Sequence, residues 1–194
     1  MKEKLNQIAK RGFEENLKIK SEILNSEIIS QIVNTSIAII GCLKNKSKIF
    51  FAGNGGSFAD SQHLAAEFIS KFLVNRSAIP AIALGTNSSI LSSISNDFKY
   101  EDTFSRELSA LGKSGDIFLP ISTSGNSKNI VKAVKIAKDL NIKSIALTGS
   151  TGGELGSFCE CIKVPSTNVA RIQECHILIG HLICEIVEQE IFKS

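Results

Sequence analysis

The cysteines of this sequence form no CxxC pair, and there are five of them, an odd number. A disulfide scaffold and a zinc ribbon are both built from paired cysteines, so neither class of protein fits. We therefore expect reduced thiols in the core of the protein. The five residues are Cys42, Cys159, Cys161, Cys175 and Cys184.

The excess of positive over negative charge is also small. The chain has 22 Lys+Arg against 19 Asp+Glu, a formal charge of +3, and no run of basic residues, which argues against a nucleic-acid partner. The N-terminal residues lack the apolar centre of a signal peptide, and no apolar run approaches the length of a membrane span. We expect a cytoplasmic protein with neither a nucleic acid nor a membrane as partner.

What the sequence does contain is typical of a globular protein. Of its 194 residues, 43% are apolar and 21% are charged, and there is no internal repeat, linker or low-complexity segment. This length fits one domain with a full hydrophobic core.

Residues 3 to about 44 have apolar residues at three- and four-residue steps, which predicts one long or two shorter helices. Such an arm can pack on its own domain or on a partner subunit. We expect residues 1–46 to form a helical arm for oligomerisation and residues 47–194 to form the main domain. The apolar positions are Leu5, Ile8, Leu17, Ile23, Leu24, Ile28, Ile32 and Val33.

From residue 47 onward, short apolar runs alternate with helical patterns. This alternation predicts a three-layer α/β/α sandwich with a five-stranded parallel sheet, whose ligand lies at the carboxyl ends of the strands. The C-terminal helix is apolar almost all round, which again indicates an oligomer. The expected strands are 49–52, 79–84, 115–121, 144–147 and 161–164. One helix is expected to begin after residue 57, and further helices are expected at 88–95, 102–111, about 128–140 and 170–191.

A glycine turn, residues 53–57, follows the first expected strand and precedes a helix. This geometry directs backbone N–H groups at an anion. Phe58 stands where a dinucleotide fingerprint has its third glycine, and no GK[ST] follows, so neither a Rossmann motif nor a P-loop is present. A tight turn with no ligand remains the alternative.

The segment after the third expected strand, Ser122–Ser127, carries four hydroxyl groups. With no lysine in the loop, a sugar phosphate suits it better than a nucleoside triphosphate. The alternative is ordinary N-capping of the next helix, which explains Ser124 or Asn126 but not the cluster.

His63 and Glu67 are four residues apart and share a helix face. On the C-terminal helix, Gln173 and His181 differ by about 80° around the axis and share a broad side. Imidazole, carboxylate and amide groups are a possible zinc set, whereas a helix-surface pair is the alternative for His63 and Glu67. The third histidine, His176, is interpreted as a satisfied core or interface residue.

Five segments taken together, GNGGS…ADSQHLAAEF, ISNDF, ISTSGNS, ALTG..GG and ARIQECHILIGH, resemble the phosphoheptose (sedoheptulose 7-phosphate) isomerases of the sugar isomerase, or SIS, superfamily. The similarity runs from about residue 47 to the end. It implies a flavodoxin-like sheet, a homotetramer, and one zinc per subunit bound by His63, Glu67, Gln173 and His181. Many members have Asp where this chain has Ala170, which affects a secondary polar contact.

The resemblance implies conversion of D-sedoheptulose 7-phosphate to D-glycero-D-manno-heptose 7-phosphate through an enediol, toward the heptose of a bacterial lipopolysaccharide or capsule. Glu67 and His181 are the expected acid/base pair. The substrate-binding residues it implies are Asn54, Gly55, Gly56, Ser57, Glu67, Asn96, Asp97, Ser122, Thr123, Ser124, Ser127 and Gln173.

The same superfamily includes non-catalytic regulators, which bind a replication-initiation protein or a sugar phosphate. The resemblance implies that such a regulator keeps the hydroxyl loop but loses the glutamate and the second histidine. This chain has both Glu67 and His181. We therefore expect an enzyme.

Overall fold

The computed structural model describes residues 1–192. Its five strands form one parallel sheet in the order β2-β1-β3-β4-β5. This is the flavodoxin-like order, with the topological switch point between β1 and β3. The expected fold class is confirmed. The strands are β1 (Ile49–Ala52), β2 (Ala81–Ala83), β3 (Ile117–Ser122), β4 (Lys143–Thr148) and β5 (Glu160–Lys163).

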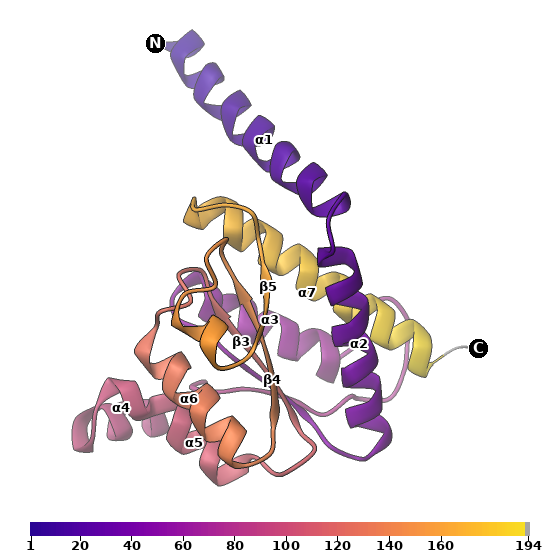
Figure 1. The fold of residues 1–194 in the computed structure, drawn as a ribbon, viewed down its shortest axis with the longest axis vertical. Coiled ribbons are helices and arrows are strands. Elements are labelled where there is room, and N and C mark those ends of the chain that lie inside the picture. Colours follow the sequence, from indigo (N-terminus) through magenta and orange to yellow (C-terminus); the bar gives the residue numbers. More distant parts are fainter. Residues whose placement is uncertain (193–194) are drawn as a thin grey trace.

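Helices cover both faces of the sheet (Figure 1). Alternate side chains of each strand point to opposite faces, so β1 contributes Phe51 to one core and Phe50 to the other. The Phe51 core is closed by α2 (Ile28–Lys44), α3 (Gly56–Ile69) and α7 (Val169–Ile191). The Phe50 core is closed by α5 (Thr103–Leu111) and α6 (Lys128–Asp139), with α4 (Ser88–Asp97) beside α5.

The N-terminal segment is two helices, because α1 (Lys2–Leu24) meets α2 at a bend of 70°. In Figure 1, α1 projects from the body of the molecule. Ile23, Ile28 and Ile32 are buried, as the periodicity predicts. The other five apolar positions of that pattern are exposed in this single chain: Leu5, Ile8, Leu17, Leu24 and Val33.

Two element boundaries differ from expectation. Strand β2 has only three residues, following Pro80, which has no N–H to donate to a ladder. Helix α3 ends at Ile69, short of Phe72, and Ile69 is 50% exposed instead of lying in the core. The helix ends there because the side chain of Arg76 binds carbonyl groups of its last turn, those of Glu67 and Phe68.

No single helix among residues 1–192 is both long enough and apolar enough to cross a membrane; α1 and α2 meet that criterion only as a bent pair.

Candidate active site

The turn between β1 and α3 depends on its glycines. Gly55 has φ +58°, a conformation that favours glycine, and Gly56 begins the helix. A Cβ on Gly56 would lie 2.5 Å from Nε2 of Gln173, so with any other residue there the amide of Gln173 would have to move away. The first turn of α3, which includes the buried Ser57, is thereby held against α7 at the carboxyl end of β1.

Asn54 links three segments at the switch point between β1 and β3. Its amide exchanges two hydrogen bonds of 2.9 Å with the amide of Asn129 on α6. Tyr100 donates its hydroxyl to Oδ1 of Asn54, also at 2.9 Å. The turn after β1 is therefore tied to the start of α6 and to the segment that follows α4.

The four hydroxyl groups of the loop after β3 do not cap α6. Ser127, not Ser124 or Asn126, occupies the N-cap position, and its side chain makes no capping bond. Its Oγ lies 3.1 Å from Oγ of Ser122, and Oγ of Ser124 accepts from the N–H of Asn126. N-capping therefore does not account for the hydroxyl cluster.

The same loop is held by its neighbours. The carbonyl of Thr123 accepts from the N–H of Gly149, and Oδ1 of Asn126 accepts from the N–H of Glu154 at 2.8 Å. Gly125, with φ +68°, packs so closely on Gly152 that a Cβ would collide with the Gly152 carbonyl. The contacts with these neighbours thus fix the shape of the loop.

Asn96 and Asp97 end α4 and are exposed. The amide of Asn96 donates to the carboxylate of Asp97 at 2.8 Å. The chain then reaches Tyr100, which contacts Asn54. The structure therefore connects this pair to the glycine turn through a tyrosine. Among residues 1–192, neither side chain has a hydrogen bond to another expected substrate residue.

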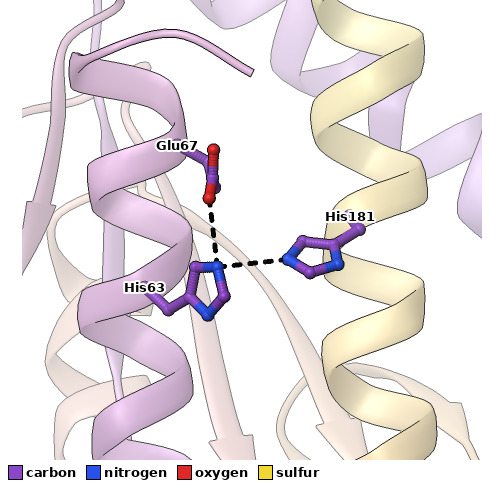
Figure 2. Close-up of side chains that lie close together, drawn as sticks. All are labelled: His63, Glu67 and His181. Carbon is purple, nitrogen blue, oxygen red and sulfur yellow. Dashed lines mark hydrogen bonds and ion pairs between the residues drawn. The ribbon is translucent and has the colours of Figure 1, made fainter. Parts of the chain in front are cut away.

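His63, Glu67 and His181 converge between α3 and α7 (Figure 2). Nε2 of His63 lies 3.0 Å from Oε1 of Glu67 and 3.3 Å from Nε2 of His181. One proton on Nε2 of His63 cannot satisfy both neighbours, whereas a cation could accept a lone pair from each. The ligand atoms of all three lie within 4.8 Å of one another, so the donor set suits a metal ion.

The surroundings of His181 favour its neutral form. Partial burial and then the neighbouring His63 lower the pKa of His181, while the Glu67 carboxylate opposes the shift. The ring of Phe72 lies on another side of the imidazole, with centroids 5.5 Å apart. A neutral imidazole can bind a metal or accept a proton.

Comparison with known proteins agrees with this geometry. Residues 13–149 match the SIS domain family. The chain is 51% identical to phosphoheptose isomerase 2 of Campylobacter jejuni, over 98% of this chain and 96% of that one. It is 46% identical to a phosphoheptose isomerase of Aneurinibacillus thermoaerophilus, over 98% and 97%. The chain belongs to the phosphoheptose isomerase family.

Solved structures of the family have the same fold. A phosphoheptose isomerase from Francisella tularensis superposes with a TM-score of 0.91 at 37% identity, covering 96% of this chain and 98% of that one. One from Neisseria gonorrhoeae gives 0.90 at 37%, covering 95% and 99%.

In this member of the phosphoheptose isomerase family, Gln173 does not join His63, Glu67 and His181 within one chain. Its amide packs on Gly56, seven residues before His63 on α3. At 1.5 Å per residue the two levels are roughly 10 Å apart, beyond the reach of a glutamine side chain. The expected set of four ligands is therefore incomplete in the single chain.

His176 is a core histidine, as interpreted from the sequence. It is fully buried, and its Nε2 donates to the carbonyl of Thr148 at 3.1 Å. Burial lowers the pKa of His176 to about 4, although the hydrogen bond to Thr148 acts to raise it. It therefore stays neutral and apart from the site of this isomerase.

Sequence reasoning missed several residues that shape the isomerase site. Tyr100 and Asn129 form hydrogen bonds with Asn54, but neither residue belongs to a recognisable sequence motif. The single tyrosine, close behind the Asn96-Asp97 pair, was the available signal for Tyr100. Asp60 was also missed. Its Oδ2 is buried without a hydrogen-bond partner among the described residues. Burial raises the pKa of Asp60, and the nearby His63 opposes that shift.

Proposed function

We propose that the protein is an aldose–ketose isomerase that converts D-sedoheptulose 7-phosphate to D-glycero-D-manno-heptose 7-phosphate. One observation carries this proposal. Glu67 and His181, from helices far apart in the sequence, both reach His63, and their ligand atoms lie within 4.8 Å of one another. The membership of the chain in the phosphoheptose isomerase family supplies the substrate class.

The reaction moves one proton from C1 to C2. We assign the carbon-bound proton to Glu67: the carboxylate removes it from C1, the electron pair forms the C1–C2 double bond, and the C2 carbonyl oxygen gains a proton to give the enediol. The carbon proton is then delivered to C2, and the C1 hydroxyl gives up its proton to become the aldehyde. His181, held neutral, carries the proton between the two oxygens.

His63, Glu67 and His181 would hold a zinc ion, one per subunit, which when bound supplies Lewis acidity to the substrate carbonyl. A ligating atom cannot carry a proton at the same time. Carboxylate and imidazole each have a second heteroatom, so Glu67 and His181 can serve both tasks. Gln173 would complete the set only where subunits meet, because within one chain it stays with Gly56.

The loop Ser122–Ser127 would bind the phosphate of the substrate. Its hydroxyl groups and N–H groups offer donors in a fixed arrangement, next to the glycine turn at the switch point. The free energy of phosphate binding at this place would help to hold C1 and C2 in position for the reaction. Asn96 and Asp97 would contact the sugar hydroxyl groups beside Tyr100.

The exposed apolar residues of α1 support an oligomer, and we propose a homotetramer with residues 1–46 as the oligomerisation arm. All five cysteines are free, in keeping with the reducing cytoplasm. The product would serve the heptose of a bacterial lipopolysaccharide or capsule.

The test is turnover of sedoheptulose 7-phosphate by the purified protein, followed by NMR of the sugar, with unphosphorylated sedoheptulose as the matched control. The proposal expects the aldose 7-phosphate to accumulate and the control ketose to react far more slowly. If neither ketose reacts in metal-loaded protein, the proposed function is wrong.

A further inference from the structure

A buried carboxylate anchors the segment that follows α3. Glu188, on α7, is 2% exposed. Its Oε1 accepts from the N–H groups of Leu73 and Val74, at 2.6 and 2.9 Å, and its Oε2 accepts from that of Phe72 at 3.0 Å. Burial raises the pKa of Glu188, but these three N–H groups and Arg76 outweigh it and lower the pKa to about 2. The carboxylate is therefore charged and fully bonded.

Arg76 completes this cluster and reaches the site. Its Nε donates to Oε2 of Glu188 at 2.5 Å, and both side chains are 2% exposed. Its Nη1 donates to the carbonyl of Phe68 at 2.9 Å, and its Nη2 donates to the carbonyl of Glu67 at 2.8 Å. The guanidinium thus binds the backbone of the proposed proton carrier itself. Its Nη1 also donates to the carbonyl of Ser77 at 3.0 Å, so the guanidinium serves four acceptors, more than the three N–H donors of a lysine.

The same cluster reaches His181 from the other side. Phe72, whose N–H is bound by Glu188, places its ring 5.5 Å from the ring of His181. Glu188 follows His181 by seven residues, two turns along α7. The pair therefore joins the end of α3, which carries Glu67, to the helix that carries His181.

We propose that Arg76 and Glu188 are positioning residues of the active site, which hold Glu67 and His181 at the separation that the metal and the enediol chemistry need. This inference rests on the proposed function for its kinetic part alone. Neither side chain forms a hydrogen bond with the side chains of His63, Glu67 or His181, so each acts through the groups that it binds. Loss of a partner that orients metal ligands typically weakens metal binding about 10- to 100-fold.

The test uses Arg76→Lys in the full-length protein. Lysine keeps the charge opposite Glu188 but cannot bind Glu188 and three carbonyls at once. Lys143→Arg is the matched control, because it makes the reverse exchange in an exposed pair with Glu160, at the start of β4 and away from the carboxyl ends of the strands. Should Arg76→Lys fail to fold, Phe72→Leu serves instead, because it removes only the ring beside His181 and keeps the backbone bonds of Glu188.

Three readouts separate positioning from a general loss of stability. We expect kcat to fall about 10- to 100-fold with KM within about twofold, since a small misplacement of catalytic groups costs this much. We expect the dissociation constant of zinc to rise about 10- to 100-fold. The chain has three histidines, so in metal-stripped protein the Hε1 NMR signals of His63 and His181 should shift while that of the core residue His176 stays.

The inference is overturned if the folded variant keeps the kcat, the zinc affinity and both histidine signals of the Lys143→Arg control. Failure of the proposed function is a different result, in which the unsubstituted protein does not isomerise sedoheptulose 7-phosphate. The zinc and NMR measurements on Arg76→Lys would still decide the positioning role in that case.

Discussion

Gly180 on α7 packs on Leu64 of α3 so closely that a Cβ would lie 2.5 Å from the Leu64 side chain. The next residue along α7 is His181, and the residue before Leu64 is His63. The absence of a side chain at Gly180 therefore sets the distance between the two helices where the two imidazoles meet, with Nε2 atoms 3.3 Å apart.

Gly180→Ala should separate these helices. Overpacking costs about 1–3 kcal/mol of unfolding free energy, partly offset by the higher helix propensity of alanine. We expect weaker zinc binding by calorimetry, and recovery when Leu64 is also changed to Ala. Gly41→Ala is the control: it lies within α2 with nothing within 4 Å of the added Cβ, so it should be neutral or stabilising. Unchanged zinc affinity in Gly180→Ala would contradict this role of the glycine.

Replacing Ser122 and Ser124 together with Ala removes two donors from the loop after β3. The loop keeps the bond from the N–H of Gly149 to the Thr123 carbonyl and the bond from the N–H of Glu154 to the Asn126 side chain, so stability should change little. Loss of two hydrogen bonds to a charged group weakens sugar-phosphate binding by about 3–6 kcal/mol. Calorimetry with sedoheptulose 7-phosphate measures it. Unchanged binding would mean that these hydroxyls do not bind the phosphate.

His176 makes stability depend on pH. Its folded-state pKa of about 4 lies below the ordinary value of 6.5, so its stabilising effect is complete above pH 6.5 and is lost as the pH falls toward 4. The shift corresponds to about 3 kcal/mol. Urea unfolding between pH 7.5 and 4 should show a loss of unfolding free energy that is smaller by that amount in His176→Gln than in the unsubstituted protein. Equal losses in the two proteins would contradict the assignment.

Removal of residues 1–17, the part of α1 that lies before its core residues, should lower the oligomeric state and abolish turnover. The cut is placed after Leu17, because Ile19 and Ile23 of α1 belong to the core. Light scattering gives the mass, and circular dichroism confirms that the rest folds. Phe13→Ser is a gentler variant, since this side chain is 75% exposed and lies outside the core of its own chain. A truncated monomer that isomerises at full rate would refute a site shared between subunits.

The fold could be predicted from the sequence because each strand is a short apolar run bounded by turns. The β1 run and the face of α6 are local patterns, and the order of parallel strands follows from the family resemblance. Boundaries were less certain. The end of α3 depends on Arg76, which lies seven residues beyond the end of the helix and gives no local signal.

The site could be predicted in part. His63 and Glu67 share a face by spacing alone, but their meeting with His181 depends on the parallel packing of α3 and α7. The same packing places Gln173 at Gly56. The sequence argument compared only the angles of Gln173 and His181 around the helix, and an angle says nothing of how far apart two residues lie along the helix axis. The amide pair of Asn54 and Asn129 depends on the β1–β3 pairing, a tertiary contact.

The most direct test of the account is isomerisation of sedoheptulose 7-phosphate in deuterium oxide by the metal-loaded protein, with Glu67→Gln as the matched variant. The account predicts an aldose 7-phosphate that carries deuterium at C2, as an enediol that exchanges with solvent requires. Glu67→Gln should remain folded while its turnover falls about 100-fold or more, because glutamine keeps the shape but cannot take the proton. No isomerisation by the unsubstituted protein, or near-normal turnover by Glu67→Gln, would contradict it.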